Sequence, residues 1–193
     1  MRIIAGKFKG RRLAAIKGDI VRPTSDRVKE SIFSILGGRV VDADFLDLCA
    51  GTGNMGLEAL SRGANAATFI DRDYRSIGII QSNLRRCGLN PGQPEVQLIK
   101  LDVYKGLASL ARRRACFDLI YFDPPYDTNL HNACLTQIVT NELVTRSGEI
   151  LVEGRRPEKG DCLAPITVDG LALKRQERYG DTIVSFYQWK DTR

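Results

Sequence analysis

Short apolar runs alternate with longer stretches of helical hydrophobic spacing along the chain after about residue 40. This alternation is typical of a parallel sheet whose strands are connected by helices. It predicts strands at 44–49, 67–71, 96–101, 119–123 and 149–153, and helices near 54–62, 74–87, 104–113 and 130–141. Gly63, Gly88 and Gly148 are expected to act as stop signals for helices.

Two further β-rich runs, 171–178 and 182–189, are joined across Tyr179-Gly180-Asp181. They predict a hairpin that closes the sheet with an antiparallel edge. The chain is therefore expected to have an α/β fold with a mostly parallel sheet.

The first 39 residues, called the head below, have a different pattern of hydrophobic and polar positions. Arg2–Ile4 and Arg12–Ile16, separated by glycines and lysines, suggest a basic hairpin outside the main sheet. Ser25 or Asp26 can cap a helix that carries a periodic apolar set, namely Val28, Ile32, Ile35 and Leu36. We therefore expect a basic N-terminal extension of hairpin and helix, residues 1–39, packed on a main domain, residues 40–193.

Composition narrows the class of protein. A chain of 193 residues with 43% hydrophobic content is long enough to bury a full core as one domain. No apolar run approaches the roughly 20 residues that cross a bilayer, and the N-terminus lacks the apolar stretch of a signal peptide. We expect a soluble, cytoplasmic protein that does not enter a membrane.

The positive charge is concentrated in the head. The formal net charge is +6, but residues 1–39 hold ten Lys and Arg against three acids, and the remainder holds 19 against 20. Clustered positive charge favours a polyanionic partner.

Neither a metal site nor a disulfide framework is expected. The five cysteines are widely spread without a C-x-x-C pair, and His131 is the only histidine. No G-x-S-x-G elbow is present, and we expect His131 to lie on the surface.

A glycine-rich loop follows the first predicted strand. Gly51, Gly53 and Gly56 satisfy the G-x-G-x-x-G pattern of dinucleotide-binding loops, and Asp71 lies 20 residues after Gly51. Asp47, directly before the loop, would repel a pyrophosphate, whereas it favours the ammonium and sulfonium of S-adenosylmethionine. Charge therefore favours S-adenosylmethionine over a dinucleotide.

Acids end three successive predicted strands. Asp71 can accept both ribose hydroxyls, Asp102 can accept from an adenine amino group, and Val103 can lie against the ring. Each acid alone could simply cap a helix, but three at the carboxyl edge of one sheet favour a ligand site. The expected cofactor-binding residues are Asp47, Ala50, Gly51, Gly53, Asp71, Asp102 and Val103.

The candidate catalytic segment ends the fourth predicted strand and consists of Asp123, Pro124, Pro125 and Tyr126. The Asp123 carboxylate and the Pro124 carbonyl could accept the two N–H groups of an exocyclic amine and orient its lone pair towards a methyl donor. Tyr126 could stack on an unstacked or flipped base.

Four segments together resemble the bacterial RsmD-type 16S ribosomal RNA guanine-N2 methyltransferases. They are Arg22–Phe33, Asp47–Gly53, Gly56–Ala64 and Asp123–Tyr126. The resemblance covers nearly the whole chain. Cys49 is a departure, because the family commonly has an aromatic residue there.

The resemblance implies a class I methyltransferase fold with a seven-stranded sheet and a Rossmann-like core. It also implies S-adenosylmethionine as methyl donor, S-adenosylhomocysteine as product, and transfer to N2 of one guanine in 16S ribosomal RNA, either free or in the assembling small subunit. We expect a monomer that contacts RNA through Lys7, Lys9, Arg11, Arg12, Arg22 and Arg27.

Other functions stay open at this point. The same hydrogen bonds would serve the N6 amine of adenine in RNA or DNA, or a glutamine amide in a protein. A non-enzymatic RNA-binding protein and a nicotinamide dehydrogenase are less consistent with the intact Asp123–Tyr126 segment and with Asp47.

Overall fold

The computed structural model describes residues 1–15, 26–124, 128–155 and 166–190, without the side chains of 128 and 129. In these residues seven strands form one sheet in the order β3-β2-β1-β4-β5-β7-β6. The strands are β1 (Asp44–Leu48), β2 (Ala66–Asp71), β3 (Val96–Lys100), β4 (Phe117–Phe122), β5 (Val144–Arg155), β6 (Leu171–Tyr179) and β7 (Thr182–Trp189). β1 to β5 run parallel, and β7 is antiparallel to β5 and β6. The predicted fold class is confirmed.

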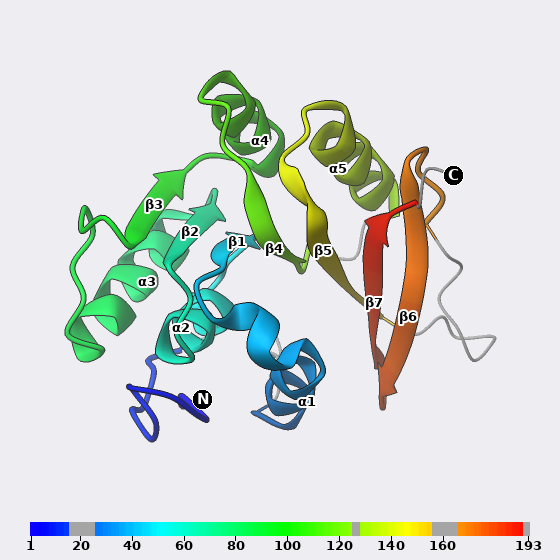
Figure 1. Cartoon of the computed structure of the whole chain (residues 1–193). Helices are drawn as coiled ribbons and strands as arrows, with labels where there is room; N and C mark the ends of the chain where they lie inside the picture. Colours follow the sequence, from blue (N-terminus) through cyan, green and yellow to red (C-terminus); the bar gives the residue numbers. More distant parts are fainter. Residues whose placement is uncertain (16–25, 125–127, 156–165, 191–193) are drawn as a thin grey trace.

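Helices cover both faces of the sheet (Figure 1). One face carries α1 (Asp26–Leu36), α2 (Asn54–Ser61) and α3 (Tyr74–Arg86), and the other carries α4 (Val103–Arg112) and α5 (Thr128–Thr140). A short 3-10 helix, Gly37–Val40, follows α1. Because both faces are covered, the central strands are apolar on both sides and do not alternate with polar residues.

The prediction that Gly148 ends a helix is wrong. α5 ends at Thr140, and Gly148 lies inside β5, which begins five residues earlier than predicted. A Cβ on Gly148 would lie 2.8 Å from the carbonyl oxygen of Asp118, where the pairing of β4 and β5 shifts register. The glycine therefore permits a close approach of two strands.

The N-terminal segment, defined here as residues 1–15, forms a single antiparallel bridge between Arg2 and Arg12, not two strands. Its apolar side chains Ile3, Phe8 and Leu13 are buried. Residue 16 of the predicted hairpin lies outside the described residues.

Contacts with α2 hold this segment in place. The backbone N–H groups of Ile4 and Ala5 donate to the two oxygens of Glu58, at 2.9 and 3.1 Å. Gly6 has a φ of +81°, and a Cβ there would lie 1.7 Å from the carbonyl oxygen of Ser61. Only glycine fits this approach of two backbones.

α1 begins at Asp26, while Ser25, the other candidate cap, lies outside the described residues. The buried face of α1 differs from the predicted one. Phe33 is buried where Ile35 was expected, and Lys29 is fully buried on the same face. The ammonium of Lys29 donates to the Arg2 carbonyl at 2.7 Å and pairs with Glu58 at 3.1 Å.

Further contacts of Lys29 connect three segments of the chain. It also donates to the side-chain oxygen of Asn54 at 2.7 Å, and Arg62, the residue directly after α2, pairs with Glu58 at 2.8 Å. Burial lowers the pKa of Lys29, while Glu58 opposes this change. The N-terminal segment, α1 and α2 are thus joined around one buried ion pair.

We expect Glu58→Gln to lower the free energy of unfolding by about 3 kcal/mol, because Lys29 would keep a buried charge without its counter-ion. Urea denaturation at neutral pH measures this loss. Glu142→Gln is the matched control, since Glu142 pairs with Arg146 and both side chains are 73% exposed. That control should lose less than about 1 kcal/mol. Equal losses in the two variants would contradict the role given to the buried pair.

Candidate functional site

Three of the predicted acids lie at the carboxyl ends of neighbouring strands. Asp47 is the penultimate residue of β1, Asp71 ends β2, and Asp123 directly follows β4. β1 lies between β2 and β4, so the structure brings the three carboxyl groups to one edge. Open α/β sheets bind ligands at this edge, where the strand order reverses around the first strand.

Asp47 is the most deeply buried of these acids, with 2% of its surface exposed. One oxygen accepts the backbone N–H of Gly56 at 2.9 Å, which ties the start of α2 to β1. Burial raises the pKa of Asp47 to about 8, Gly56 opposes this rise, and Asp71 adds to it. A cation bound at this edge would favour the ionised form.

Asp71 supports the glycine loop from the neighbouring strand. Its two oxygens accept the backbone N–H groups of Gly51 and Asp73, at 2.8 and 2.9 Å. Each carboxylate oxygen has a second lone pair. Asp71 can therefore hold the loop and still accept from a ligand hydroxyl.

The loop itself depends on left-handed backbone. Cys49, Gly51 and Gly53 have φ values of +58°, +55° and +73°. Gly56 has a different role, because a Cβ there would lie 2.4 Å from the ring of Phe69. The first two glycines of the pattern thus shape the loop, and the third lets α2 pack closely on β2.

The Cys49 thiol is half-buried, and burial and the nearby Asp71 raise its pKa. A thiol that resists ionisation is a poor nucleophile. Ala50 is buried in the loop and donates its N–H to the Ile70 carbonyl at 3.0 Å.

Asp102 acts as a helix cap. It accepts the backbone N–H of Lys105 at 3.1 Å and begins α4. The same hydrogen bond lowers the pKa of Asp102, and burial opposes it. Val103 is buried in the first turn. A role in adenine binding for this pair stays a prediction.

Asp123 and the buried Pro124 are described, whereas Pro125 and Tyr126 lie outside the described residues. Burial and the carboxyl groups of Glu153 and Asp47 raise the pKa of Asp123 well above its usual range. Glu153 is a neighbour that the sequence analysis missed.

The prediction that His131 lies on the surface is wrong. The side chain is buried on α5, with its ring edge-on to Phe122 at 5.7 Å between centroids. Its Nε2 lies 3.4 Å from the carbonyl oxygen of Glu153. The single histidine therefore packs from α5 against the carboxyl ends of β4 and β5.

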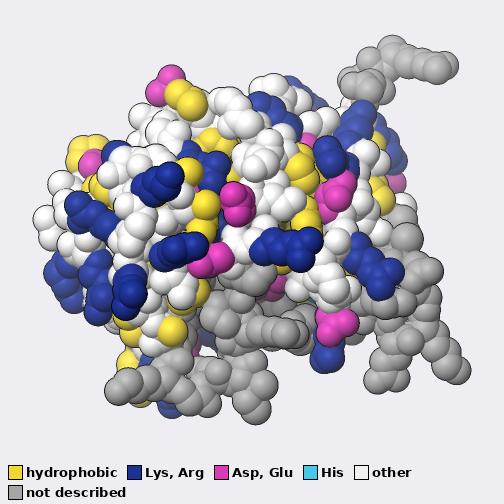
Figure 2. All heavy atoms as spheres, turned by 90° about the horizontal axis from the view of Figure 1, so that it is seen from below, with side chains coloured by type: hydrophobic (Ala, Val, Ile, Leu, Met, Phe, Trp, Pro, Cys, Tyr) yellow, Lys and Arg dark blue, Asp and Glu magenta, His cyan; other side chains and the backbone are white. Residues whose placement is uncertain are grey.

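The predicted RNA-contacting residues within the described part of the chain are exposed; they are Lys7, Lys9, Arg11, Arg12 and Arg27. Arg22 lies outside the described residues. The Arg11 guanidinium donates to the carbonyl of Arg86 at the end of α3, and Arg85 and Arg86 are themselves exposed. Figure 2 shows Lys and Arg side chains gathered at the side of the molecule on which α3 and the N-terminal segment lie.

Asn83, on α3, connects the N-terminal segment to the glycine loop. Its side chain accepts from the N–H of Ala14 at 2.7 Å, and donates to the carbonyls of Ala14 and Thr52 at 3.1 and 2.9 Å. The sequence analysis missed this residue. Its spacing of three from Ile80, on the buried face of α3, was the available signal.

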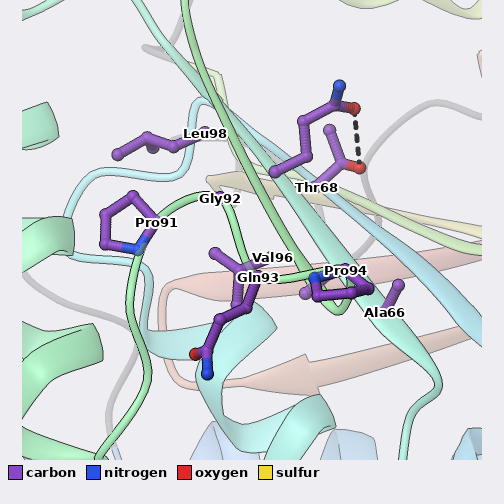
Figure 3. A pocket seen from close by; sticks show the side chains of 10 residues that line it. Ala66, Thr68, Pro91, Gly92, Gln93, Pro94, Val96 and Leu98 are labelled. Atoms are coloured by element: carbon purple, nitrogen blue, oxygen red, sulfur yellow. Dashed lines mark hydrogen bonds between the residues drawn. The ribbon is translucent and has the colours of Figure 1, made fainter.

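A cavity of about 500 Å³ lies elsewhere, at the amino ends of β2 and β3. Thr68, Pro91, Pro94 and Leu98 are among its lining residues (Figure 3). None of the predicted site residues lines it, so it is separate from the acidic edge.

The described residues limit what can bind at the acidic edge. No ion pair among them involves Asp47, Asp71 or Asp123. They contain no group of three or more His, Cys, Asp and Glu arranged to hold a metal ion. The edge therefore offers carboxylates without described cationic partners.

No helix within the described ranges has the length and apolarity to span a bilayer.

The strand order, the glycine loop after β1 and the acids at successive strand ends define the class I methyltransferase fold. The family described as "Conserved hypothetical protein 95" matches residues 1–188, and the chain belongs to this family, the RsmD family.

Individual relatives agree over nearly their whole length. A Bacillus subtilis protein provisionally named rRNA methyltransferase YlbH is 39% identical over 188 residues, which are 97% of this chain and 98% of that one. Ribosomal RNA small subunit methyltransferase D of Haemophilus influenzae is 32% identical over 97% of this chain and 93% of its own. The solved structure of yhhF from Escherichia coli, provisionally named a methyltransferase, has a TM-score of 0.83 and 29% identity, covering 100% of this chain and 99% of that chain.

We predict that Asp47→Asn changes how stability depends on pH. Burial raises the pKa of Asp47 from 3.8 to about 8, so between these values the unfolded chain loses a proton that the folded chain keeps, and the free energy of unfolding falls as pH rises. Asparagine cannot ionise and keeps an oxygen for Gly56. In urea denaturation from pH 5 to 8, the free energy of unfolding of the variant should rise relative to that of the wild type by up to about 1.4 kcal/mol per pH unit. Parallel profiles would show that Asp47 is not held protonated by burial.

Proposed function

We propose that the protein transfers a methyl group from S-adenosylmethionine to the N2 amino group of a guanine in 16S ribosomal RNA. The observation that carries this proposal is the acidic edge, where Asp47, Asp71 and Asp123 meet without described cationic partners. Relatives named ribosomal RNA small subunit methyltransferase D in Haemophilus influenzae and Escherichia coli support a ribosomal RNA substrate.

The residues present fit a cationic cofactor better than an anionic one. Buried carboxylates that lack a counter-ion favour an ammonium and a sulfonium, and they would repel the pyrophosphate of a dinucleotide. S-adenosylmethionine supplies an electrophilic methyl group when bound. Asp47 and the loop residues Ala50, Gly51 and Gly53 would hold its methionine part.

The other end of the cofactor would meet residues after β2 and β3. Asp71 is oriented by two backbone N–H groups and can accept ribose hydroxyls. Asp102 and Val103, at the start of α4, would contact the adenine. The cofactor would therefore lie across the carboxyl ends of β1, β2 and β3.

Asp123 and Pro124 form the acceptor side. Proline lacks a backbone N–H, so its carbonyl can accept from the amine while no donor of its own competes. The Asp123 carboxylate can accept the second N–H and stabilise the positive charge that develops on the nitrogen. Tyr126 would stack on the base.

The choice of guanine rests on the family resemblance, since the same contacts would serve the N6 amine of adenine in RNA or DNA. We place the reaction in the cytoplasm, on free RNA or on the assembling small subunit, with the protein acting as a monomer. These points also rest on the sequence and the family.

Methyl-labelled S-adenosylmethionine and 16S RNA from cells that lack the enzyme test the proposal. Nucleoside mass spectrometry should show label in N2-methylguanosine. We expect Asp123→Ala to abolish transfer, while cofactor affinity by calorimetry stays within a few-fold of wild type. Asp169→Ala, at an exposed loop residue, is the control and should keep full activity.

Label in N6-methyladenosine would overturn the guanine assignment. Equal activity of Asp123→Ala and the wild type would overturn the role of Asp123.

The N-terminal segment provides the surface for RNA. Lys7, Lys9, Arg11 and Arg12 are exposed, and hydrogen bonds join Arg11 and Arg12 to Arg86 at the end of α3, which adds a cation from a distant part of the sequence. Phosphate contacts of this kind position RNA without reading its sequence.

Replacing Lys7, Lys9, Arg11 and Arg12 together by Gln should weaken RNA binding. The slope of log affinity against log salt concentration should become shallower by up to about 3, because each lost phosphate contact removes about 0.7 to 0.9. Fluorescence anisotropy at several salt concentrations measures both effects, and cofactor affinity should not change.

Replacing Arg112, Arg113 and Arg114 by Gln gives the control, since these exposed cations lie at the end of α4 on the other face of the sheet. An unchanged salt slope in the N-terminal variant, or an equal loss in the control, would contradict the assignment of this surface.

A further inference from the structure

A second carboxyl group lies beside Asp123. Phe122 of β4 and Val152 of β5 are register partners, so the next residues, Asp123 and Glu153, stand at the same level of two adjacent parallel strands. Glu153 is 9% exposed, and its carboxyl contributes to the raised pKa of Asp123. The two carboxyl groups therefore interact in a region with little water.

Tyr121 fixes the position of Glu153. Its hydroxyl donates to Oε2 of Glu153, and the tyrosine is 2% exposed. Tyr121 precedes Asp123 by two residues, so both side chains lie on the same side of β4. Tyr121 thus orients the Glu153 carboxyl group, which neighbours Asp123.

The described groups around Asp123 and Glu153 come from several elements. Tyr121 is on β4, and Asp123 directly follows that strand. Asp47 of β1 contributes to the raised pKa of Asp123, and Nε2 of His131 on α5 lies 3.4 Å from the Glu153 carbonyl oxygen. On β7 the register partner of Glu153 is Val184, which is fully buried and apolar. Within the described residues these surroundings combine carboxyl groups with an apolar side chain, and two neighbouring anions are costly there.

We propose that Glu153, held by Tyr121, is a positioning residue that keeps Asp123 protonated in the free protein and lets it ionise when a cation occupies the acidic edge. This inference rests on the proposed function. The acceptor side would then become able to take a proton only in the protein loaded with its methyl donor.

The protonation state matters for the balance of the reaction. A bond forms between the amine nitrogen and the methyl carbon, and the bond from that carbon to sulfur breaks with its electron pair left on sulfur. The nitrogen must then lose one proton, which an ionised Asp123 can accept. A protonated Asp123 could neither accept that proton nor stabilise the developing charge.

Glu153→Gln tests the proposal because it removes the neighbouring charge while keeping size and a hydrogen-bonding oxygen. The titration of Asp123 in the free protein is followed by NMR of carbon-13-labelled aspartate carboxyls, and its signal is identified by its loss in Asp123→Asn. We expect its midpoint to fall by about one pH unit or more in Glu153→Gln. The acidic limb of the pH profile for methyl transfer should move in the same direction.

Glu149→Gln is the matched control. Glu149 is also buried, four residues earlier on the same face of β5, but it pairs with Arg39 at 3.0 Å and accepts from Gln188 at 3.0 Å. The Asp123 titration should be unchanged in this variant.

Tyr121→Phe is the second variant and keeps the test valid if Glu153→Gln folds poorly. Without its donor the Glu153 anion is less stable, so Glu153 retains its proton to higher pH and Asp123 should ionise at lower pH. An Asp123 midpoint that stays unchanged in both variants, or moves equally in Glu149→Gln, would overturn the proposal. Absence of methyl transfer by the wild type would refute the proposed function alone, because the titration is read in the free protein.

Discussion

Removing carboxyl groups from water is costly. The carboxyl edge of this sheet nevertheless removes carboxyl groups of three parallel strands from water. Burial and neighbouring carboxyl groups raise the pKa of Asp47 and of Asp123, and no described cation pairs with either. Elsewhere the same fold neutralises its buried charge, since Lys29 is surrounded by Glu58, a carbonyl and an amide oxygen. This contrast within the described residues supports the proposal that a bound cation supplies the counter-charge of the edge.

The buried pair of Lys29 and Glu58 links the proposed RNA surface to the proposed cofactor loop. α2 begins directly after the loop, and the N-terminal segment rests on Glu58 of that helix. Asn83 adds a direct connection, because it bonds both Ala14 and Thr52. The two segments that carry much of the family resemblance, Arg22–Phe33 and Gly56–Ala64, therefore contain residues that hold the fold together, and not only residues that would contact ligands.

Periodicity and loop chemistry predicted much of this architecture from the sequence. The strands of the sheet, the glycine loop after β1 and the acids at strand ends follow from local patterns. Polar residues at buried positions could not be predicted in the same way, because Lys29, Glu153 and His131 look like surface residues until their partners from distant segments are known. Gly148 was misjudged for the same reason, since its role depends on the close approach of Asp118 from another strand. The Asn83 contacts join residues more than 30 positions apart in sequence, so helical spacing indicates that Asn83 is buried but not which residues it bonds.

We infer that a cationic ligand supplies the charge that the described residues of the acidic edge lack. Calorimetric titration with S-adenosylmethionine and with S-adenosylhomocysteine, each in two buffers of different ionisation enthalpy near pH 7.5, counts the protons exchanged on binding. Only the first ligand carries the sulfonium charge, so its binding should ionise carboxyl groups of the edge and release more protons than binding of the second. Equal proton release by the two ligands, or none by either, would show that the positive charge of the ligand does not ionise the acidic edge.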